Sequence, residues 1–286
     1  MRRASAIEKE AKEINTIEDL TGIFESLAST QVAKIKNKVE LSTDFFKLLW
    51  KRYSSIRIDP KTRITNRPLA ANDAKQAFII ISAEAGLSGE IDQRLIETML
   101  QNYNSNTTDI IVLGSHGANQ LSQRNIPYVR FFKVPETDHY IDVSPVIESI
   151  LDYSKTIVYF EEYVSLSVQN IKSIDLVSSM RNMSEDVDDD IMTAYNTIFE
   201  PSLDEIADQM EITMMKLALS QTILESSLAQ AASRFNAMAV AKKRAGELIE
   251  DYMLEFHRAK RAESDRQMRE VMISIKKKRQ RTGAKR

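Results

Sequence analysis

The most regular pattern in the chain is an apolar heptad spacing near its C-terminus. Hydrophobic side chains recur alternately three and four residues apart, with Lys242 as the one polar residue in the stripe. The stripe consists of Leu224, Leu228, Ala231, Phe235, Met238, Ala245, Ile249, Tyr252, Phe256 and Ala259. Between Pro201 and Gly283 there is no proline and one glycine, Gly246. This pattern predicts one continuous helix from about residue 204 to residue 278, which needs a partner helix to cover its apolar stripe.

A second long helix is predicted over residues 5–53. Its hydrophobic residues are again three and four apart, on an otherwise polar sequence: Ile7, Ala11, Ile14, Ile17, Leu20, Phe24 and Leu27. Two amphipathic helices at opposite ends of one chain bury their stripes most simply by pairing with each other. We therefore predict an antiparallel coiled coil in which these residues form the N-terminal half of the seam.

Between the two helices the pattern changes to short apolar runs separated by turn residues. Strands are predicted at 78–81, 109–113, 128–134, 156–163 and 171–177. Helices are predicted at 90–103 and 118–124, with another starting at Ser144-Pro145. This alternation predicts a small Rossmann-like α/β domain with partly parallel strands. The fold class is thus α/β and helix-rich, with the long antiparallel helices added.

Four segments follow from these patterns. They are an N-terminal coiled-coil helix (1–57), an α/β foot domain with its linker (58–182), an acidic connection (183–203) and a C-terminal coiled-coil helix with a basic tail (204–286). Residues Met183 to Asp190 of this connection are mostly acidic, and we interpret them as a solvated link. A calcium-binding loop of the EF-hand type is disfavoured because its required glycine is missing.

Composition narrows the classes of function. The chain has 286 residues, no cysteine and a formal net charge of −2. It therefore has no disulfide framework or thiolate metal site, and its near-neutral charge argues against general nucleic-acid binding. We expect no signal peptide and no transmembrane segment, because no apolar run approaches eighteen residues. The basic cluster at residues 276–286 is short and lacks interleaved aromatics, so we interpret it as a helix end.

Two glycine turns at strand ends are the candidate chemistry of the middle domain. They contain Gly86, Ser88 and Gly89 in the first turn, and Gly114, His116 and Gly117 in the second. Neither matches a phosphate-binding loop or a serine nucleophile motif, and the histidines lack metal-ligand spacing. We predict structural turns, with no cofactor and no metal. The alternative is a small α/β enzyme that uses Ser88 and His116.

In the order of its parts and in several motifs, the chain resembles the gamma subunit of F-type rotary ATP synthases. The family loop S-D-R-G-L-C-G-G-L-N is similar to residues 83–92, and its I-G-x-K-G turn is similar to residues 113–117. The family pattern S-R-M-x-A-M-x-x-A is similar to residues 233–241, and the Arg-Gln segment of its C-terminal helix aligns with residues 256–271. The loose N-terminal match includes Thr21 and Ala28.

This resemblance implies a central rotor stalk without a catalytic site of its own. The implied partners are the alpha and beta subunits of the catalytic head, the epsilon subunit and the membrane rotor ring. The implied location is peripheral, on the cytoplasmic face of a bacterial-type plasma membrane. The residues expected to contact the alpha–beta ring are Leu20, Phe24, Leu27, Arg234, Met238, Lys260, Arg261 and Asp265.

Departures from the family pattern leave alternatives open. Lys260-Arg261 stands where the family has Arg-Gln, Ser88 replaces the loop cysteine, and a basic tail follows Ile275. A rotor of an F-type-like ATPase not coupled to proton flow remains an alternative, as does a non-rotary coiled-coil scaffold or assembly protein.

Overall fold

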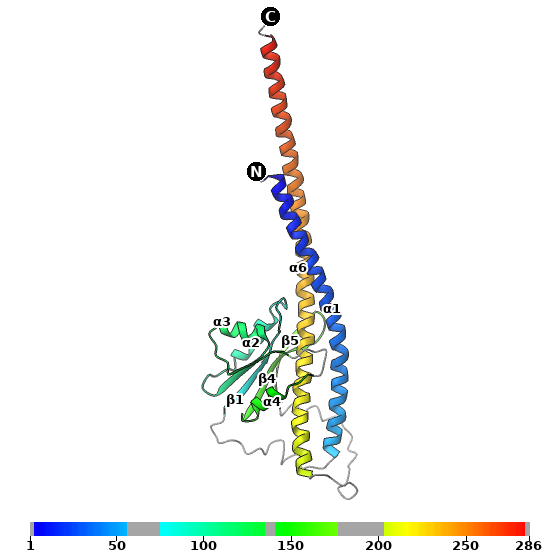
Figure 1. Ribbon diagram of the computed structural model, residues 1–286, viewed down its shortest axis with the longest axis vertical. Helices are drawn as coiled ribbons and strands as arrows, with labels where there is room; N and C mark the ends of the chain where they lie inside the picture. The colour runs from blue at the N-terminus through cyan, green and yellow to red at the C-terminus, as the bar shows by residue number, and fades with distance from the viewer. Residues whose placement is uncertain (1–2, 56–74, 135–140, 177–202, 284–286) are drawn as a thin grey trace. The chain divides into compact units, whose positions relative to one another are not determined.

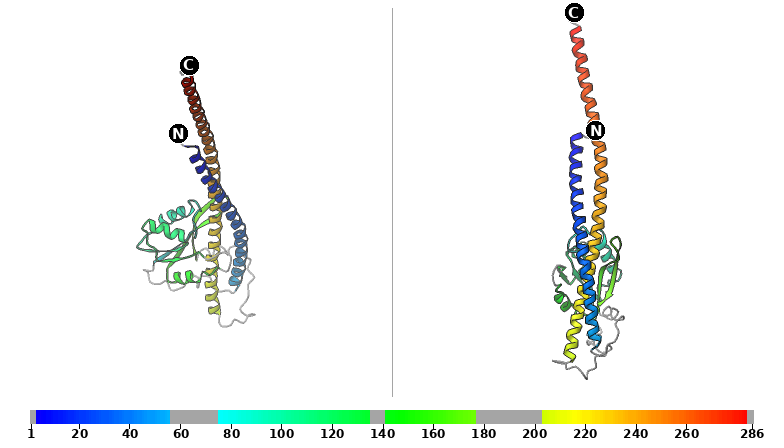
Figure 2. Two further views of the ribbon diagram at one scale, coloured as in Figure 1. Left: turned by 45° about the horizontal axis from the view of Figure 1, so that its top comes forward. Right: turned by 90° about the vertical axis from the view of Figure 1, so that its right-hand side faces the viewer.

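The computed structural model describes residues 3–55, 75–134, 141–176 and 203–283. These residues form two compact units. Unit 1 comprises Met1–Ser26 and Met238–Arg286, and unit 2 comprises Leu27–Ala237. Two long helices contribute residues to both units (Figures 1 and 2). They are α1 (Ala4–Ser55) and α6 (Leu203–Gly283).

Unit 2 contains a five-stranded sheet in the order β3-β2-β1-β4-β5. Its strands are β1 (Gln76–Ile81), β2 (Thr108–Leu113), β3 (Arg130–Phe132), β4 (Lys155–Tyr163) and β5 (Gln169–Asp175). The first four strands are parallel to their neighbours, and β5 runs antiparallel to β4. Three short helices connect them, namely α2 (Ile91–Leu100), α3 (Ser115–Gln123) and α4 (Ser144–Ile150).

Both faces of the sheet are covered, which explains why its central strands contain continuous apolar runs, such as residues 77–81 and 110–113. Phe78 and Ile80 of β1 pack with residues of α2 and α3 on one face. Ile79 and Ile81 of the same strand point to the other face, where α4 and the long helices lie. The Rossmann-like α/β fold and the pair of long helices predicted from the sequence are therefore confirmed.

Within unit 2, α1 and α6 pack into the hydrophobic core on the sheet face opposite α2 and α3. Ile35 and Phe46 of α1 and Met214 and Leu219 of α6 belong to the same buried cluster as strands β1, β2 and β4. A polar contact accompanies this packing, because the amide of Gln221 donates to the hydroxyl of Thr43 over 3.0 Å. The lower parts of the long helices are thus integral to the core of unit 2.

Within unit 1, the seam of α6 follows the predicted heptads. Met238 and Ala245 are buried, and Ile249, Tyr252, Phe256 and Ala259 are half-buried between exposed neighbours. From Glu263 to Lys276 every residue is exposed. The heptad pattern therefore identified the buried face of α6 in this unit.

The seam of α1 was predicted only in part. Ile7 and Ala11 are buried and Ile14 is half-buried, as expected. The stripe predicted after Ile14 is wrong, because its residues are exposed: Ile17, Leu20, Phe24 and Leu27. The buried and half-buried residues after Ile14 instead include Glu18, Thr21 and Glu25, which continue the heptad spacing of Ile7, Ala11 and Ile14.

The remaining element predictions agree with the structure within a few residues. The helix predicted at 118–124 is α3, which begins directly at the second glycine turn, and the strand predicted at 128–134 is the shorter β3. The linker at 58–73 and the acidic connection, apart from residue 203, lie outside the described residues. None of the described helices is long and apolar enough to cross a membrane.

Candidate functional site

A cluster of buried polar side chains, which we call the polar crevice, lies at the carboxyl ends of β1 and β4, within unit 2. The chain leaves β1 toward β2 and β3 on one side of the sheet, whereas β4 lies on the other side of β1. This is the switch point at which doubly wound folds usually bind their ligands. Here the crevice is occupied by side chains of the loop after β1, of β4 and of α6.

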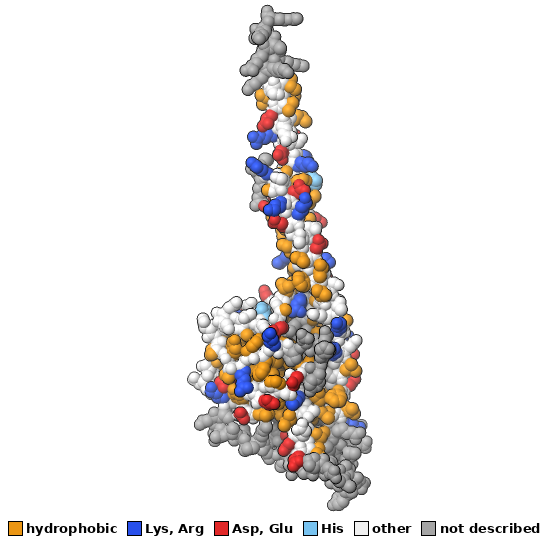
Figure 3. Space-filling view, in the orientation of Figure 1, with side chains coloured by type: hydrophobic (Ala, Val, Ile, Leu, Met, Phe, Trp, Pro, Cys, Tyr) orange, Lys and Arg blue, Asp and Glu red, His pale blue; other side chains and the backbone are white. Residues whose placement is uncertain are grey.

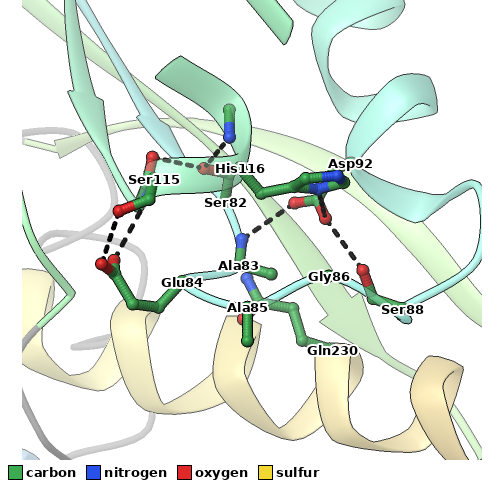
Figure 4. A network of polar contacts seen from close by, with 12 residues as sticks. Ser82, Ala83, Glu84, Ala85, Gly86, Ser88, Asp92, Ser115, His116 and Gln230 are labelled. Atoms are coloured by element: carbon green, nitrogen blue, oxygen red, sulfur yellow. Dashed lines mark hydrogen bonds and ion pairs between the residues drawn. The ribbon is translucent and has the colours of Figure 1, made fainter. Parts of the chain in front are cut away.

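Asp92 organises the loop after β1. Its side chain is fully buried and accepts three hydrogen bonds: from the backbone N–H of Ala83 at 2.9 Å, from the hydroxyl of Ser88 at 3.0 Å and from Nδ1 of His116 at 2.8 Å. Figure 4 shows the carboxylate lying between the histidine ring and Ser88. A neighbouring carboxylate, Glu84, holds the second turn by accepting from the hydroxyl of Ser115 at 2.5 Å.

Glu161 on β4 is the second buried carboxyl of the crevice. Its Oε2 atom accepts from the hydroxyl of Ser226 at 2.9 Å and from the amide of Gln230 at 2.7 Å. Burial, and then the charge of nearby Asp92, raise the pKa of the Glu161 carboxyl well above its ordinary value, and the two hydrogen bonds only partly oppose this. Oε1 has no hydrogen-bond partner among the described residues. Burial and the nearby charge of Asp92 therefore favour the neutral form of the Glu161 carboxyl.

Helix α6 closes the crevice with a polar face. Ser226, Gln230, Ser233 and Arg234 follow helical spacing, and Gln230 points toward the loop in Figure 4. The hydroxyl of Ser233 donates to the carbonyl of Ser88 over 2.6 Å. The guanidinium of Arg234 donates to the carbonyls of Ala85 at 3.2 Å and Gly86 at 3.3 Å. The loop is thus fastened to the helix along its whole length.

The glycines of the second turn are required by packing. A Cβ atom on Gly114 would lie 2.2 Å from the carbonyl oxygen of Ser82, and Gly114 also has a φ of +103°. A Cβ on Gly117 would lie 2.3 Å from the Ser82 hydroxyl, which accepts a hydrogen bond from the Gly117 N–H at 3.0 Å. In the first turn, Gly89 has a φ of +70°. These positions serve close backbone packing.

The geometry disfavours the alternative of a hydrolytic site. A serine nucleophile must donate to a histidine base, whereas Ser88 and His116 both bond to Asp92 and not to each other. Ser88 is also buried. Two buried carboxyls, Asp92 and Glu161, make the crevice unsuitable for a phosphate. Among the described residues, no group of three or more His, Cys, Asp or Glu side chains could hold a metal ion.

The buried acid gives a test of this arrangement through pH. Because the native state keeps the Glu161 proton to a higher pH than the unfolded chain does, stability falls as pH rises from the unfolded pKa of about 4.3 toward the raised pKa. Glu161→Gln keeps the shape and is neutral at every pH. We expect it to reduce this slope by up to ~1.4 kcal/mol per pH unit and to stabilise the protein at pH 7.

Urea unfolding at several pH values measures the difference between the two slopes. Glu162→Gln is the matched control, since it removes the neighbouring carboxylate of the same strand, which pairs with Lys172 at 2.7 Å instead of entering the crevice. The control should keep the wild-type slope. Equal slopes for wild type and Glu161→Gln would show that Glu161 is ionised in the folded protein.

The residues predicted to contact the alpha–beta ring are placed in different environments. Exposed fractions are 49% for Leu20 and 38% for Phe24, in unit 1, and 55% for Leu27, in unit 2. Lys260, Arg261 and Asp265 are exposed on α6. Met238 is buried, and Arg234 is engaged by the loop carbonyls, so these two offer little free surface.

The remaining contacts of this group are local. Lys260 lies over the ring of Phe256, with Nζ 5.6 Å from its centroid, and Arg261 donates to the carbonyl of His257 over 3.3 Å. Figure 3 shows basic, acidic and hydrophobic side chains interspersed along this part of α6. The exposed side of the helix is therefore chemically mixed.

Sequence reasoning missed the central residues of the crevice. Glu161 follows an apolar run in β4, and no motif in the sequence marks its carboxyl as part of a site. Ser226 and Gln230 lie four residues apart on the otherwise buried face of α6, which is a signal that could have indicated a polar contact. Asp92 was recognised only as the end of the loop.

The chain is similar along nearly its whole length to known proteins. A family model described as ATP synthase matches residues 3–276. The ATP synthase gamma chain of Staphylococcus epidermidis is 21% identical, over 95% of this chain and 98% of the relative. The ATP synthase gamma chain of Rhodopirellula baltica is 23% identical, over 96% of this chain and 98% of the relative.

Solved structures show the same fold. The rotor of the Euglena gracilis mitochondrial ATP synthase matches with a TM-score of 0.62 and 13% identity, over 90% of this chain and 98% of that one. A chain from the OSCP/F1/c-ring structure of the same enzyme matches with a TM-score of 0.66 and 12% identity, over 95% and 94% of the two chains.

Proposed function

The chain belongs to the ATP synthase family, where the relatives it matches are gamma chains, and we propose that it works as the central rotor stalk of an F-type enzyme. In that role it couples rotation, driven by ion flow, to ATP synthesis or hydrolysis on a ring of alpha and beta subunits. The chain itself is a non-catalytic subunit. Rotation of an asymmetric stalk biases each surrounding site in turn, because each site meets a different face.

The observation that carries this proposal is the construction of unit 1. Its two helices bury only a narrow seam, and hydrophobic residues remain exposed outside it. On α1 these include Ile17, Leu20 and Phe24, with exposed fractions of 53%, 49% and 38%. We call these three residues the outward apolar face. A helix pair with an apolar side and charged sides presents different chemistry in different directions, as a stalk of this kind requires.

We assign contacts with the alpha and beta subunits to both helices. Leu20, Phe24 and Leu27 would supply apolar contacts from α1, and Lys260, Arg261 and Asp265 would supply charged contacts from α6. Exposure of all six side chains supports this assignment. The charged residues suit contacts that form and break as the stalk turns, since exposed ion pairs are individually weak.

We assign contacts with the epsilon subunit and with the membrane rotor ring to the foot domain in unit 2. Its turns at Gly86, Ser88 and Gly89 and at Gly114, His116 and Gly117 serve to build the foot and take no part in catalysis. The filled, acidic crevice supports a non-catalytic foot, because the usual ligand position of the fold is closed by α6. Through these partners the protein would be peripheral to the cytoplasmic face of a bacterial-type membrane.

Copurification tests the proposed function. The full chain should be coexpressed with the alpha and beta subunits from the same genome, with an affinity tag on the beta subunit. We expect a complex in which this chain copurifies and ATP hydrolysis depends on its presence. A complex of alpha and beta subunits that excludes the chain, or a homodimer of the chain in sedimentation, would support a non-rotary scaffold instead.

A further inference from the structure

One stretch of the seam in unit 1 is polar on both helices. Glu18 and Glu25 of α1 follow buried Ala11 at intervals of seven residues, so heptad spacing gives all three the same type of seam position. Lys242 occupies the corresponding position of α6, between buried Met238 and Ala245. Three charged residues therefore occupy positions that elsewhere in this unit are apolar.

Each helix has a glycine where a charged residue of the other helix crosses it. A Cβ atom on Gly22 of α1 would lie 3.6 Å from Cε and 3.7 Å from Nζ of Lys242. In the reverse direction, a Cβ on Gly246 of α6 would lie 3.5 Å from Oε1 of Glu18. Glycine is unfavourable inside a helix, and Gly246 is the only one between Pro201 and Gly283. At these distances a Cβ would be in ordinary van der Waals contact, so the glycines mark where the charged side chains lie close to the backbone of the other helix, although an alanine would also fit.

The lysine also has a charged partner across the seam. Nζ of Lys242 lies 3.1 Å from Oε2 of Glu25, and the two side chains are 47% and 24% exposed. A partly exposed ion pair of this kind adds little stability, and apolar residues would bury more surface at these positions. Polar residues at seam positions instead specify the register of a coiled coil at a cost in stability.

A shift of register would disrupt these contacts together, and it would also displace the buried residues of α1 in unit 2, so the contacts in unit 1 act in addition to that packing. If α1 moved by one heptad so that Lys242 faced Glu18, the lysine stem would meet Asn15 in place of Gly22. Glu25 would then have no cation opposite it, and Glu18 would no longer lie at Gly246. Only the observed register keeps the ion pair together with the two close approaches at the glycines.

We propose that Glu18, Gly22, Glu25, Lys242 and Gly246 act as positioning residues that fix the axial register of the helix pair. We call this group the register lock. It rests on the proposed rotor function in one respect: the lock would set the height of the outward apolar face relative to the charged residues of α6, and so which contacts each stalk face presents to the ring.

Spin-label distances in the full chain test the lock directly. The chain has no cysteine, so Ala6→Cys and Val240→Cys, both at exposed positions of unit 1, give two unique attachment points. These sites are far apart along the pair, so a slip of one heptad changes their separation by about 10 Å. We expect a single narrow distance distribution for the chain with its lock intact.

Replacing the three charges by leucine separates register from stability. The variant Glu18→Leu, Glu25→Leu, Lys242→Leu should melt at a higher temperature and yet show more than one distance between the labels. One unchanged narrow distance in this variant would overturn the proposal. Should the variant aggregate, Glu25→Lys alone serves as the second variant, and it should broaden the distribution because it places two lysines together.

A charge exchange provides the matched rescue. Glu25→Lys combined with Lys242→Glu restores an ion pair at the same positions, so the single distance should return. Failure of this rescue would show that the ion pair does not set the register. The label measurement needs no other subunit, so failure of the chain to join alpha and beta subunits would count against the rotor function while leaving the register result intact.

Discussion

Replacing Leu219 by aspartate is expected to unfold unit 2. Leu219 is fully buried on α6 within the cluster that joins the sheet, α4 and α1. A carboxylate at this position would have to be buried without a partner or protonated, and the leucine packing would be lost. We expect a loss of at least about 4 kcal/mol, which is a large part of the stability of an ordinary domain. Thermal and urea melts followed by circular dichroism measure it.

The same substitution at an exposed position of α1 is the control. Leu41 is 71% exposed, so Leu41→Asp introduces the same charge without desolvating it. Its effect should stay within about 0.5 kcal/mol. Equal melting of the two variants would mean that α6 does not pack on the sheet as described here.

The second large effect is expected in the assembled enzyme. The triple variant Ile17→Ser, Leu20→Ser, Phe24→Ser removes the outward apolar face without touching the seam. Burying such side chains against a partner contributes roughly 1.5–3 kcal/mol each, so the loss of all three should weaken the stalk–ring contact severely. We expect ATP hydrolysis by the complex with alpha and beta subunits to fall at least about tenfold, which corresponds to ~1.4 kcal/mol in the barrier.

A matched control separates this contact from general surface effects. Leu41, Phe45 and Leu48 are also exposed apolar side chains of α1, and they are not among the residues that we assign to the ring contact. Changing all three to serine should leave hydrolysis by the same soluble complex near the wild-type rate. Melting temperatures of both triple variants should stay close to that of the wild type. If the first variant hydrolyses ATP normally, the outward apolar face is not a ring contact.

Local periodicity was sufficient to predict most of the fold. The strands around Ile80 and Val112 contain continuous apolar runs because helices cover both sheet faces, and these runs are visible in the sequence. The α6 seam could be read from its heptads alone. These features depend on residues close together in the chain, so no knowledge of the partner segment was needed.

The α1 seam could not be read in the same way. Beyond Ile14, the apolar residues lie next to the seam and the charged residues lie within it. A carboxylate at a seam position is acceptable here because residues from far along the chain meet it: Lys242 pairs with Glu25, and Gly246 lies beside Glu18. The crevice was missed for the same reason, since the hydrogen bonds of Glu161 come from Ser226 and Gln230, which are far away in the sequence.

The polar face of α6 in the crevice has a mechanical consequence. Apolar side chains that pack by contact area alone can slide past one another with little directional resistance, whereas hydrogen bonds weaken steeply when their geometry is distorted. Ser233 and Arg234 bind three carbonyls of the loop after β1, and Gln230 binds Glu161 of β4. A twisting force on the foot domain would therefore be transmitted to α6 through these hydrogen bonds. They resist rotation of the helix relative to the foot domain.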